Sequence, residues 1–537
     1  MGESRGTPDL VTREEFYERL HARLPSGPRM LTAYERDVMM RAAARAASAL
    51  RQAQGRPEQS RGAAEPRSLR PGLVAEILRF YDQLRRQSRT VSRFESLLEE
   101  TLIADAESDR GAARMLAQTR FLAATFEGYE RRVTESGAFD EHVLRARLMA
   151  EASPHPLRHI VVAVGDWIAD PNGLYLADFD LLTRLPGVDT LDIVATDGLL
   201  ASGFHQRLHE WLPGIEEVPA RPSDPAARRP LLTVPAGESG RLVFVHRDRE
   251  EELIALARHV AGQGFGRDSL DRVAVVYKRP LPYLYLAPTV FGGARLPYQT
   301  IDGFPLAAEP FAAALDVVFE FVESGFTRRS IVGLLRSPHF AFPHEGRAVD
   351  AESVAALDRG LSGRRYLGGL DRLVDIAATW RDGEVARPAI AAACAAARRL
   401  SPLLSPAPAS VGLRLLLAFI DTYGELRLKA DATSDTADNG WSRLERARAA
   451  VRASIESLAD AHAAHDDPAV VIADLAATVR RFLEDQTLAP EPGGAGVQLV
   501  DDQAARYGEF DEMAIVGLIE GEWPERPRRN IFYPPSL

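Results

Sequence analysis

Lysine is almost absent from this chain, and its two lysines limit the chemistry that the chain can perform. Of 65 basic residues only Lys278 and Lys429 are lysines, and the other 63 are arginines, a bias typical of a GC-rich genome. A phosphate-binding P-loop, GxxxxGK[ST], needs a lysine directly after a glycine, whereas Lys278 follows Tyr277 and Lys429 follows Leu428. We therefore expect no P-loop within these 537 residues.

Other residue patterns that could hold a metal or a dinucleotide are incomplete. The single cysteine, Cys394, excludes a disulfide framework and a cysteine-built metal site, which suits a reducing compartment. His205 and His209 stand four residues apart and Glu210 follows, but HxxxHE lacks the HExxH order of zinc hydrolases and no third ligand is evident. We expect no bound metal. The glycines of GQGFG at 262–266 follow a predicted helix instead of a strand, so they indicate a helix-ending turn.

Arginines and aromatic residues could contact a nucleic acid at two places. Arg79, Arg86 and Arg93 recur every seven residues, with Arg89 near the same face, so one amphipathic helix would carry an arginine stripe. Such a stripe could follow a DNA backbone, although a solvated helix face is the commoner explanation. The aromatic run Tyr283, Tyr285, Phe291 and Tyr298 could stack bases, but the interleaved prolines and leucines favour packing within a loop.

Composition and charge describe an ordinary globular protein. Hydrophobic residues make up 46% and charged residues 26% of the chain, and its length suits roughly three or four domains. The net charge of −11 argues against a generally basic nucleic-acid coat, but a local arginine track remains compatible with DNA binding. No segment approaches about eighteen uninterrupted apolar residues, and the first residues lack the pattern of a signal peptide. We expect a cytoplasmic protein without membrane contact.

The periodicity of apolar residues divides the chain. Residues 1–150 are predicted to form a helical domain, with a mobile loop at about 51–70 where proline, glycine and polar residues replace the periodicity. From His159 onward, the runs HIVVAV, LDIVAT, RLVFVH and RVAVVY predict strands that alternate with helices, which indicates a mostly parallel sheet. The proline-rich segment RPSDPAARRPLLTVPAGESG is the expected boundary between two α/β units.

The second α/β unit is expected to be interrupted. Residues 151–235 would form the remainder of the first unit and 236–345 the second. Residues 346–490 are alanine-rich and helical, with turns predicted at SGRR, SPAPAS and SDTADNG. The runs GVQLVDDQ and DEMAIVGL in 491–537 restore strand character. This order predicts a helical insertion, after which the chain returns to the second unit.

The C-terminal segment carries the most specific pattern. A strand is followed by Ala505–Asp511 (ARYGEFD), a second strand at Met513–Val516, and Gly517–Pro524 (GLIEGEWP). This segment resembles the region around motif V of UvrD/RecB-like superfamily 1 helicases, and most closely its degenerate form in AddB/RexB-type helicase–nuclease subunits. The resemblance covers about residues 10–537. It implies an α/β fold of two RecA-like, P-loop-NTPase-type domains on parallel sheets with large helical insertions.

Two further segments resemble that family in the expected order. His246–Glu252 (HRDREEE) looks like the motif IV entry to the second RecA-like domain, where the family uses an arginine near nucleotide phosphate. Arg247 or Arg249 could make that contact by bidentate hydrogen bonding, but an acidic first helical turn with solvated arginines explains the segment equally well. HIVVAVGDWIADP stands where the family carries its Walker B acids. Only Asp166 occupies such a position, with Gly165 in place of the first acid.

The resemblance assigns expected roles to a small set of residues. LDIVATDGLLASGF, with Thr196 and Asp197, stands in the place of motif III in a similarly weakened form. Expected nucleotide contacts, all degenerate, are Asp166, Arg247, Arg249 and Glu509. Expected DNA contacts are Arg79, Arg86 and Arg93 of the stripe, together with Arg506 and Trp523.

Several family motifs have no counterpart in this sequence. The P-loop would lie before Met1 and motif VI beyond Leu537. A PD-(D/E)XK nuclease needs an ExK triplet, but Val276 precedes Lys278 and Arg427 precedes Lys429 at the required spacing, so no nuclease centre is expected. We therefore expect no catalytic residue and no cofactor in this chain; ATP and magnesium would enter only with segments outside it.

Three functions follow from these observations. The first is a helicase-like DNA-binding scaffold for double-strand-break repair in an AddAB/RecBCD-like helicase–nuclease, with single-stranded or forked DNA and an AddA-like subunit as partners. The second is a fragment of an active ATP-dependent DNA helicase/exonuclease. The third is a protein-interaction scaffold for a nuclease partner.

Overall fold

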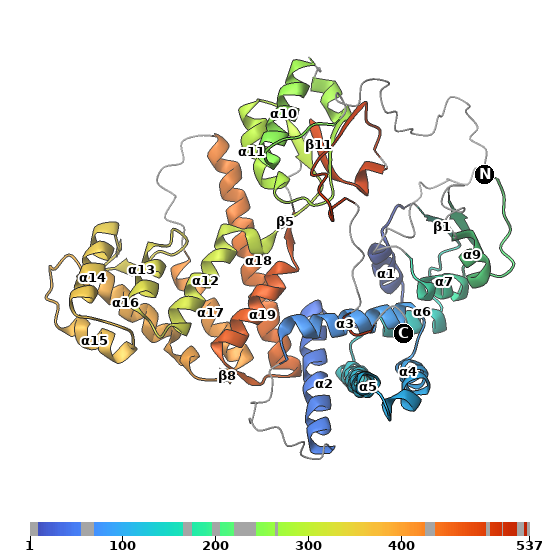
Figure 1. Ribbon diagram of the computed structural model, residues 1–537, viewed down its shortest axis with the longest axis horizontal. Helices are drawn as coiled ribbons and strands as arrows, with labels where there is room; N and C mark the ends of the chain where they lie inside the picture. Colours follow the sequence, from blue (N-terminus) through green and yellow to red (C-terminus); the bar gives the residue numbers. More distant parts are fainter. Residues whose placement is uncertain are drawn as a thin grey trace.

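The computed structural model describes residues 9–54, 69–164, 174–195, 204–219, 243–263, 267–424, 435–489, 495–506, 508–523 and 531–533. Helices predominate among them, and the parallel strands belong to two separate sheets (Figure 1). The predicted α/β class with parallel sheets is therefore confirmed. The proline-rich connector lies outside the described residues, as does most of the loop expected at 51–70; its first residues instead continue a helix to Gln54.

The N-terminal third is helical. Its helices are α1 (Arg13–Ala22), α2 (Ala33–Gln54), α3 (Pro71–Arg86), α4 (Val91–Ala106), α5 (Arg110–Ser136) and α6 (Glu141–Ala150). The side chains of Asp109 and Asp140 accept hydrogen bonds from backbone N–H groups at the starts of α5 and α6, which satisfies donors that a helix leaves unpaired. Apolar faces of α2 to α5 meet in one cluster around Phe126 and Tyr129.

The arginine stripe expected on one helix is not formed, because the segment folds as two helices. α3 ends at Arg86, and Thr90 caps the start of α4 by accepting a hydrogen bond from the Arg93 backbone N–H. Between them Ser88 has a φ of 56°, a left-handed conformation that ends a helix. The seven-residue spacing therefore does not place Arg79, Arg86 and Arg93 on a common helical face.

The first α/β unit is small in the described residues. β1 (His159–Ala163) pairs in parallel with β2 (Thr190–Val194), as HIVVAV and LDIVAT predict. α7 (Leu176–Arg184) lies between them in sequence, and α9 (His205–Trp211) follows. Phe179, Phe204 and Leu208 form the core of this unit.

The second sheet has four parallel strands in the order β12-β3-β11-β4. These are β3 (Val273–Tyr277), β4 (Tyr298–Thr300), β11 (Val497–Asp501) and β12 (Glu512–Ile515). All five residues of β3 are buried, as expected for a strand covered on both faces. The strand predicted at RLVFVH was wrong for its described part: residues 243–246 have no strand partner, and Val245 is 94% exposed. A run of β-branched residues forms a strand only where a neighbouring strand can hydrogen-bond to it.

Two helices accompany the second sheet. α10 (Arg249–Gly262) comes before β3 in the chain, with the 3-10 segment Arg267–Arg272 between them, and α11 (Tyr283–Gly293) links β3 to β4. The aromatic run predicted to pack in a loop does pack, but from a helix, because α11 carries the buried Tyr283 and Phe291. The helix accommodates Pro288 in its interior.

A large helical body separates β4 from β11 in the sequence. Its helices are α12 (Pro310–Glu323), α13 (Arg328–Arg336), α14 (Ala351–Gly363), α15 (Leu370–Ala378), α16 (Arg387–Leu400), α17 (Ala409–Tyr423), α18 (Asp435–His465) and α19 (Ile472–Glu484). Short antiparallel pairs accompany them: β5 (Phe304–Pro305) with β10 (Thr487–Leu488), β6 (Pro343–His344) with β7 (Arg347–Ala348), and β8 (Ala407–Pro408) with β9 (Ala469–Val470). The turn predicted at SDTADNG was wrong, since α18 begins there at Asp435.

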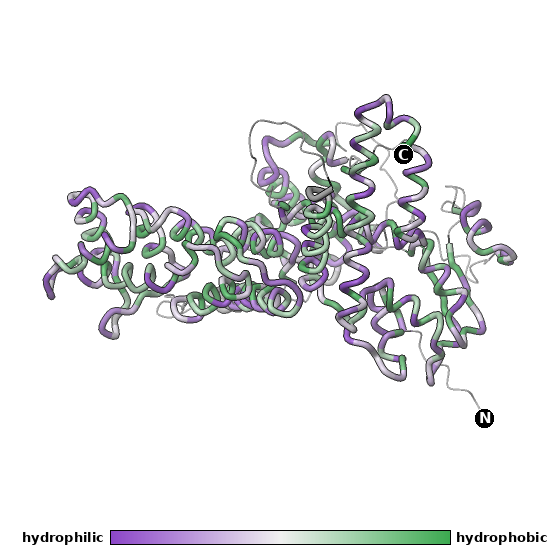
Figure 2. The backbone as a smooth tube through the Cα atoms, turned by 90° about the horizontal axis from the view of Figure 1, so that it is seen from below, coloured by the Kyte–Doolittle hydropathy of each residue, from purple (hydrophilic) through white to green (hydrophobic). Residues whose placement is uncertain are grey.

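The sheet and the helical body share one core. A single cluster of buried residues includes Leu253 of α10, Val275 of β3 and Leu416 of α17. Along these helices, hydrophobic and hydrophilic residues alternate on the scale of a helical turn (Figure 2), the pattern that lets a helix bury one face. Among the described residues, no helix is long and apolar enough to cross a lipid bilayer.

Candidate functional site

Polar residues follow three strands of the four-stranded sheet at its carboxyl edge, and a glycine comes after the fourth. Lys278 follows β3, Asp302 comes shortly after β4, Asp502 follows β11 and Gly517 comes after β12. Because the strands are parallel, these ends meet at one edge, where ligands of α/β proteins usually bind. The first turn of α10 also contacts this edge. We call the set Arg249, Glu252, Tyr277, Tyr283, Asp302, Gly517 and Glu522 the carboxyl-edge cluster.

Glu252 is the centre of this cluster. Its carboxylate accepts a hydrogen bond of 2.6 Å from the Tyr283 hydroxyl and longer ones, 3.2 and 3.3 Å, from the backbone N–H of Gly517. Gly517 has a φ of +68°, and an added Cβ would lie 2.8 Å from the Tyr283 hydroxyl oxygen. Only glycine meets both conditions without strain. Glu252 thus binds the loop after β12 to the first turn of α10.

Arg249 makes a second connection between the same two segments. Its guanidinium donates to both carboxylate oxygens of Glu522 at 2.8 Å and to the carbonyl of Leu281 at 3.2 Å. The two side chains are 25% and 20% exposed, so water screens the pair only in part. A phosphate could approach this guanidinium only in competition with Glu522.

Two more pairs complete the edge. The Tyr277 hydroxyl donates to Asp302 at 2.8 Å, and its ring stacks on that of Tyr283 with centroids 5.7 Å apart. Burial raises the pKa of Asp302; the hydrogen bond from Tyr277 opposes that shift and the nearby Asp501 charge adds to it. Lys278 donates to both oxygens of Asp502 at 3.0 Å. Acidic side chains at this edge are therefore paired with hydrogen-bond donors.

The residues expected to contact nucleotide are only partly brought together. Arg249 belongs to the carboxyl-edge cluster, whereas the Arg247 side chain is 81% exposed and donates to the neighbouring Asp248. Glu509 is exposed and precedes β12, so it lies toward the amino edge of the sheet. The four residues of β12, about 13 Å of strand, separate it from the carboxyl edge where Gly517 lies. Asp166, Gly165, Thr196 and Asp197 lie outside the described residues.

The expected DNA contacts are dispersed. Arg86 donates to Glu141 at 2.9 Å and lies over the Tyr175 ring. Burial lowers the pKa of Arg86, but the hydrogen bond to Glu141 and the charge of Glu141 outweigh it and raise the pKa. Arg79 forms an exposed ion pair with Glu76, and Arg93 is exposed on α4. Arg86 is therefore part of a buried network, while Arg79 and Arg93 face solvent.

The two C-terminal candidates differ in what the structure describes. Trp523 is half-buried and packs against a cluster that includes Ala274 and Val500 on one face of the sheet. Its indole N–H is buried without a hydrogen-bond partner among the described residues. Arg506 ends the 3-10 segment Ala504–Arg506, and its side chain lies outside the described part. Trp523 thus holds the loop after β12 against the sheet.

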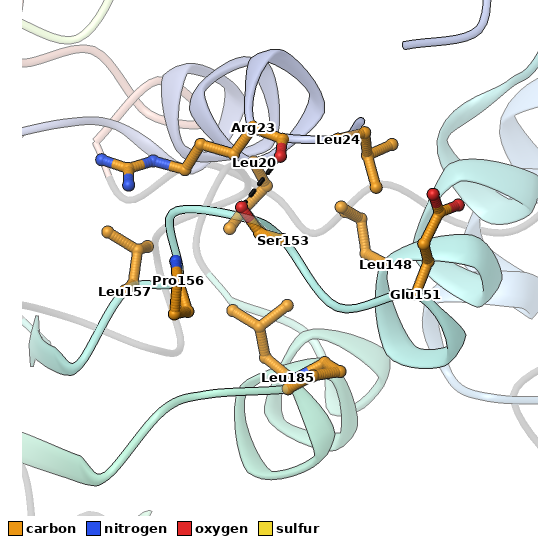
Figure 3. A pocket seen from close by; sticks show the side chains of 10 residues that line it. Leu20, Arg23, Leu24, Leu148, Glu151, Ser153, Pro156, Leu157 and Leu185 are labelled. Carbon is orange, nitrogen blue, oxygen red and sulfur yellow. Dashed lines mark hydrogen bonds between the residues drawn. The ribbon is translucent and has the colours of Figure 1, made fainter. Parts of the chain in front are cut away.

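A small cavity lies elsewhere, between α1, α6 with the segment that follows it, and the residues directly after α7 (Figure 3). Leu20, Leu148 and Leu185 line it, and Ser153 donates a hydrogen bond of 2.8 Å to the carbonyl of Arg23 at its border. Its volume of about 20 Å³ holds roughly one water molecule, far below the several hundred Å³ of a ligand pocket. We assign it no binding role.

Sequence reasoning missed most of the carboxyl-edge cluster. Glu252 and Glu522 stand within the motif-like segments and Tyr283 stands in the aromatic run, but nothing in their spacing shows that they meet. A usable signal was present: a polar or glycine residue directly follows β3 and β11, and ends of parallel strands share an edge. Two motif-like segments about 270 residues apart in the chain thereby become neighbours.

Comparisons with known proteins assign the chain to no family. No protein-family model matches the chain, and no curated protein matches it.

Proposed function

We propose that the chain is a DNA-binding scaffold of the helicase–nuclease type, acting in double-strand-break repair beside an AddA-like subunit that would supply ATP hydrolysis. In this proposal the four-stranded sheet is the core of a second RecA-like domain, and the unit containing β1 and β2 belongs to the first. The scaffold would hold single-stranded or forked DNA by arginine–phosphate contacts. It would act in the cytoplasm.

One observation carries the proposal. The segments that resemble motifs IV and V, His246–Glu252 and the described part of Gly517–Pro524, meet at the carboxyl edge through Arg249–Glu522 and Glu252–Gly517. Convergence at this edge is what a RecA-like arrangement of these segments requires. In a working motor, an arginine in this place approaches phosphate, whereas Arg249 is already paired with a carboxylate. Together with the absence of a P-loop sequence, this pairing favours a scaffold over a motor.

A binding measurement with purified full chain and labelled forked DNA tests the proposal. Three phosphate contacts to single strands predict a loss of affinity of about 20-fold between about 50 mM and about 200 mM salt. ATP turnover should stay at background with and without DNA. No binding at low salt would contradict DNA guidance, and DNA-stimulated turnover would instead favour an active helicase.

Arginine variants sharpen this test. Replacing the exposed Arg79 and Arg93 by alanine should weaken binding to all sequences alike and reduce the salt slope by about one to two. Arg184→Ala is the matched control, because Arg184 is also exposed and pairs with an acid on its own helix but lies in α7. Equal effects of the control and the test variants would remove these arginines from the interface.

A further inference from the structure

Two histidines and a glutamate converge on the solvent side of α9. His205 and His209 are one helical turn apart, and their ring centroids are 4.6 Å apart. Both Nε2 atoms bond to the same oxygen of Glu217, at 2.8 Å for His209. Within the described part of the chain, these three residues are the group whose possible ligand atoms all lie within 4.8 Å of one another.

The opposite, apolar face of α9 packs against the core of the first α/β unit and fixes the position of this group. Leu208 and Phe204 are buried, and the Trp211 ring packs on Phe179 with centroids 5.2 Å apart, so α9 is anchored by its apolar face. After α9 the chain reverses at Gly214, whose φ of +92° suits glycine. The reversal brings Glu217 back over the histidine face. The histidines therefore point outward from a fixed helix.

The donor set suits a borderline transition metal. Two imidazole nitrogens and one carboxylate oxygen are a common zinc ligand set, with metal–ligand distances of about 2.0–2.2 Å. Tetrahedral coordination then needs ligand atoms about 3.4 Å apart, within the spread that the three atoms already show. Hard cations such as Mg²⁺ prefer oxygen ligands and fit this set poorly. Solvent exposure leaves the fourth position for water.

We propose that His205, His209 and Glu217 form a zinc site that clips the segment after α9 onto the helix. The sequence pattern HxxxHE suggests Glu210 as the acid, but Glu210 bonds to Gln206 on its own helix. Glu217, eight residues beyond His209, is the carboxylate that reaches both imidazoles. The site is separate from the carboxyl-edge cluster, so its failure would leave the proposed DNA-binding function untouched.

Zinc titration of the chelator-treated full chain tests the site. We expect one zinc ion per chain at about micromolar affinity, a rise in the unfolding temperature on zinc addition, and visible d–d absorption of four-coordinate Co²⁺ when cobalt replaces zinc. His205→Ala, His209→Ala and Glu217→Gln should each weaken zinc binding by at least about 100-fold, since each removes a direct ligand and the loss of an outer-shell partner alone costs about 10–100-fold.

Two control variants make the result specific. Glu210→Gln leaves the three ligands intact, and His159→Ala removes an exposed histidine that pairs with Asp192 instead; both should keep wild-type affinity. All variants are on the surface, and equal unfolding temperatures without zinc would show that they fold. Unchanged zinc affinity in Glu217→Gln, or no binding by the wild type at tens of micromolar zinc, would overturn the proposal and leave a hydrogen-bonded cluster only.

Discussion

Replacing Gly517 by alanine should loosen the loop after β12 from α10. The substitution places an L-residue at a φ of +68°, which costs about 1–2 kcal/mol of backbone strain. It also places a Cβ 2.8 Å from the Tyr283 hydroxyl, whereas ordinary contact begins at 3.4 Å. The hydroxyl must move, which breaks its 2.6 Å bond to Glu252, a charged hydrogen bond worth about 1.5–3 kcal/mol. The two contributions together give an expected loss of stability of about 2.5–5 kcal/mol.

Urea denaturation can separate the two parts of this loss. Gly137→Ala is the matched control, because Gly137 has a φ of +67° and an added Cβ would meet nothing within 4 Å, so it should cost about 1–2 kcal/mol. In a Tyr283→Phe background the obstructing oxygen is gone, and Gly517→Ala should then cost no more than this control. Equal costs for Gly517→Ala and Gly137→Ala in the wild-type background would refute the contact between loop and tyrosine.

Three further predictions concern single side chains. Arg249→Ala should reduce stability in urea denaturation by about 1–2 kcal/mol, against about 0.5 kcal/mol or less for the exposed Arg184→Ala; equal losses would contradict the partly buried pair with Glu522. Burial raises the pKa of Asp82, but the Arg36 charge and hydrogen bonds outweigh it and lower the pKa from 3.8 to about 2, so about 2 kcal/mol of stability present above pH 4 should be lost as the pH falls to 2. Asp82→Asn should flatten that acid limb, and an unchanged limb would contradict the assignment. Burial lowers the pKa of His462 to about 4, so stability should fall as the pH drops from about 6.5 to 4, and His462→Gln should remove this loss in pH-dependent thermal unfolding; a fall of equal size in the variant would exclude His462.

The sequence predicts most individual helices and strands of this protein well, but it does not show which distant segments contact one another. Valine-rich runs such as those of β3 and β11 predict strands well, because most of their side chains are buried in the sheet. The run LVFV is equally apolar, but its described residues pair with no strand. Composition alone cannot reveal whether a partner strand is present. The predicted arginine stripe was wrong because the seven-residue spacing of the arginines continues across the start of α4, which Thr90 caps. Pairs such as Arg249–Glu522 depend on the sheet order, which no local pattern contains.

The same reason explains the zinc site and the carboxyl-edge cluster. His205 and His209 are visible as an i, i+4 pair, but Glu217 becomes their partner only through the reversal at Gly214. Glu252 and Gly517 come from distant segments, so the glycine requirement appears only once Tyr283 is seen beside the loop. Both sites are therefore formed by tertiary contacts that the sequence alone does not reveal.

The affinity for forked DNA across a salt series, measured at constant magnesium with and without ATP, tests the central proposal most directly. A scaffold whose arginine at the carboxyl edge is paired with Glu522 predicts affinity that falls steeply with salt and is the same in both series. Absence of binding at low salt, or an affinity that changes when ATP is added, would contradict it.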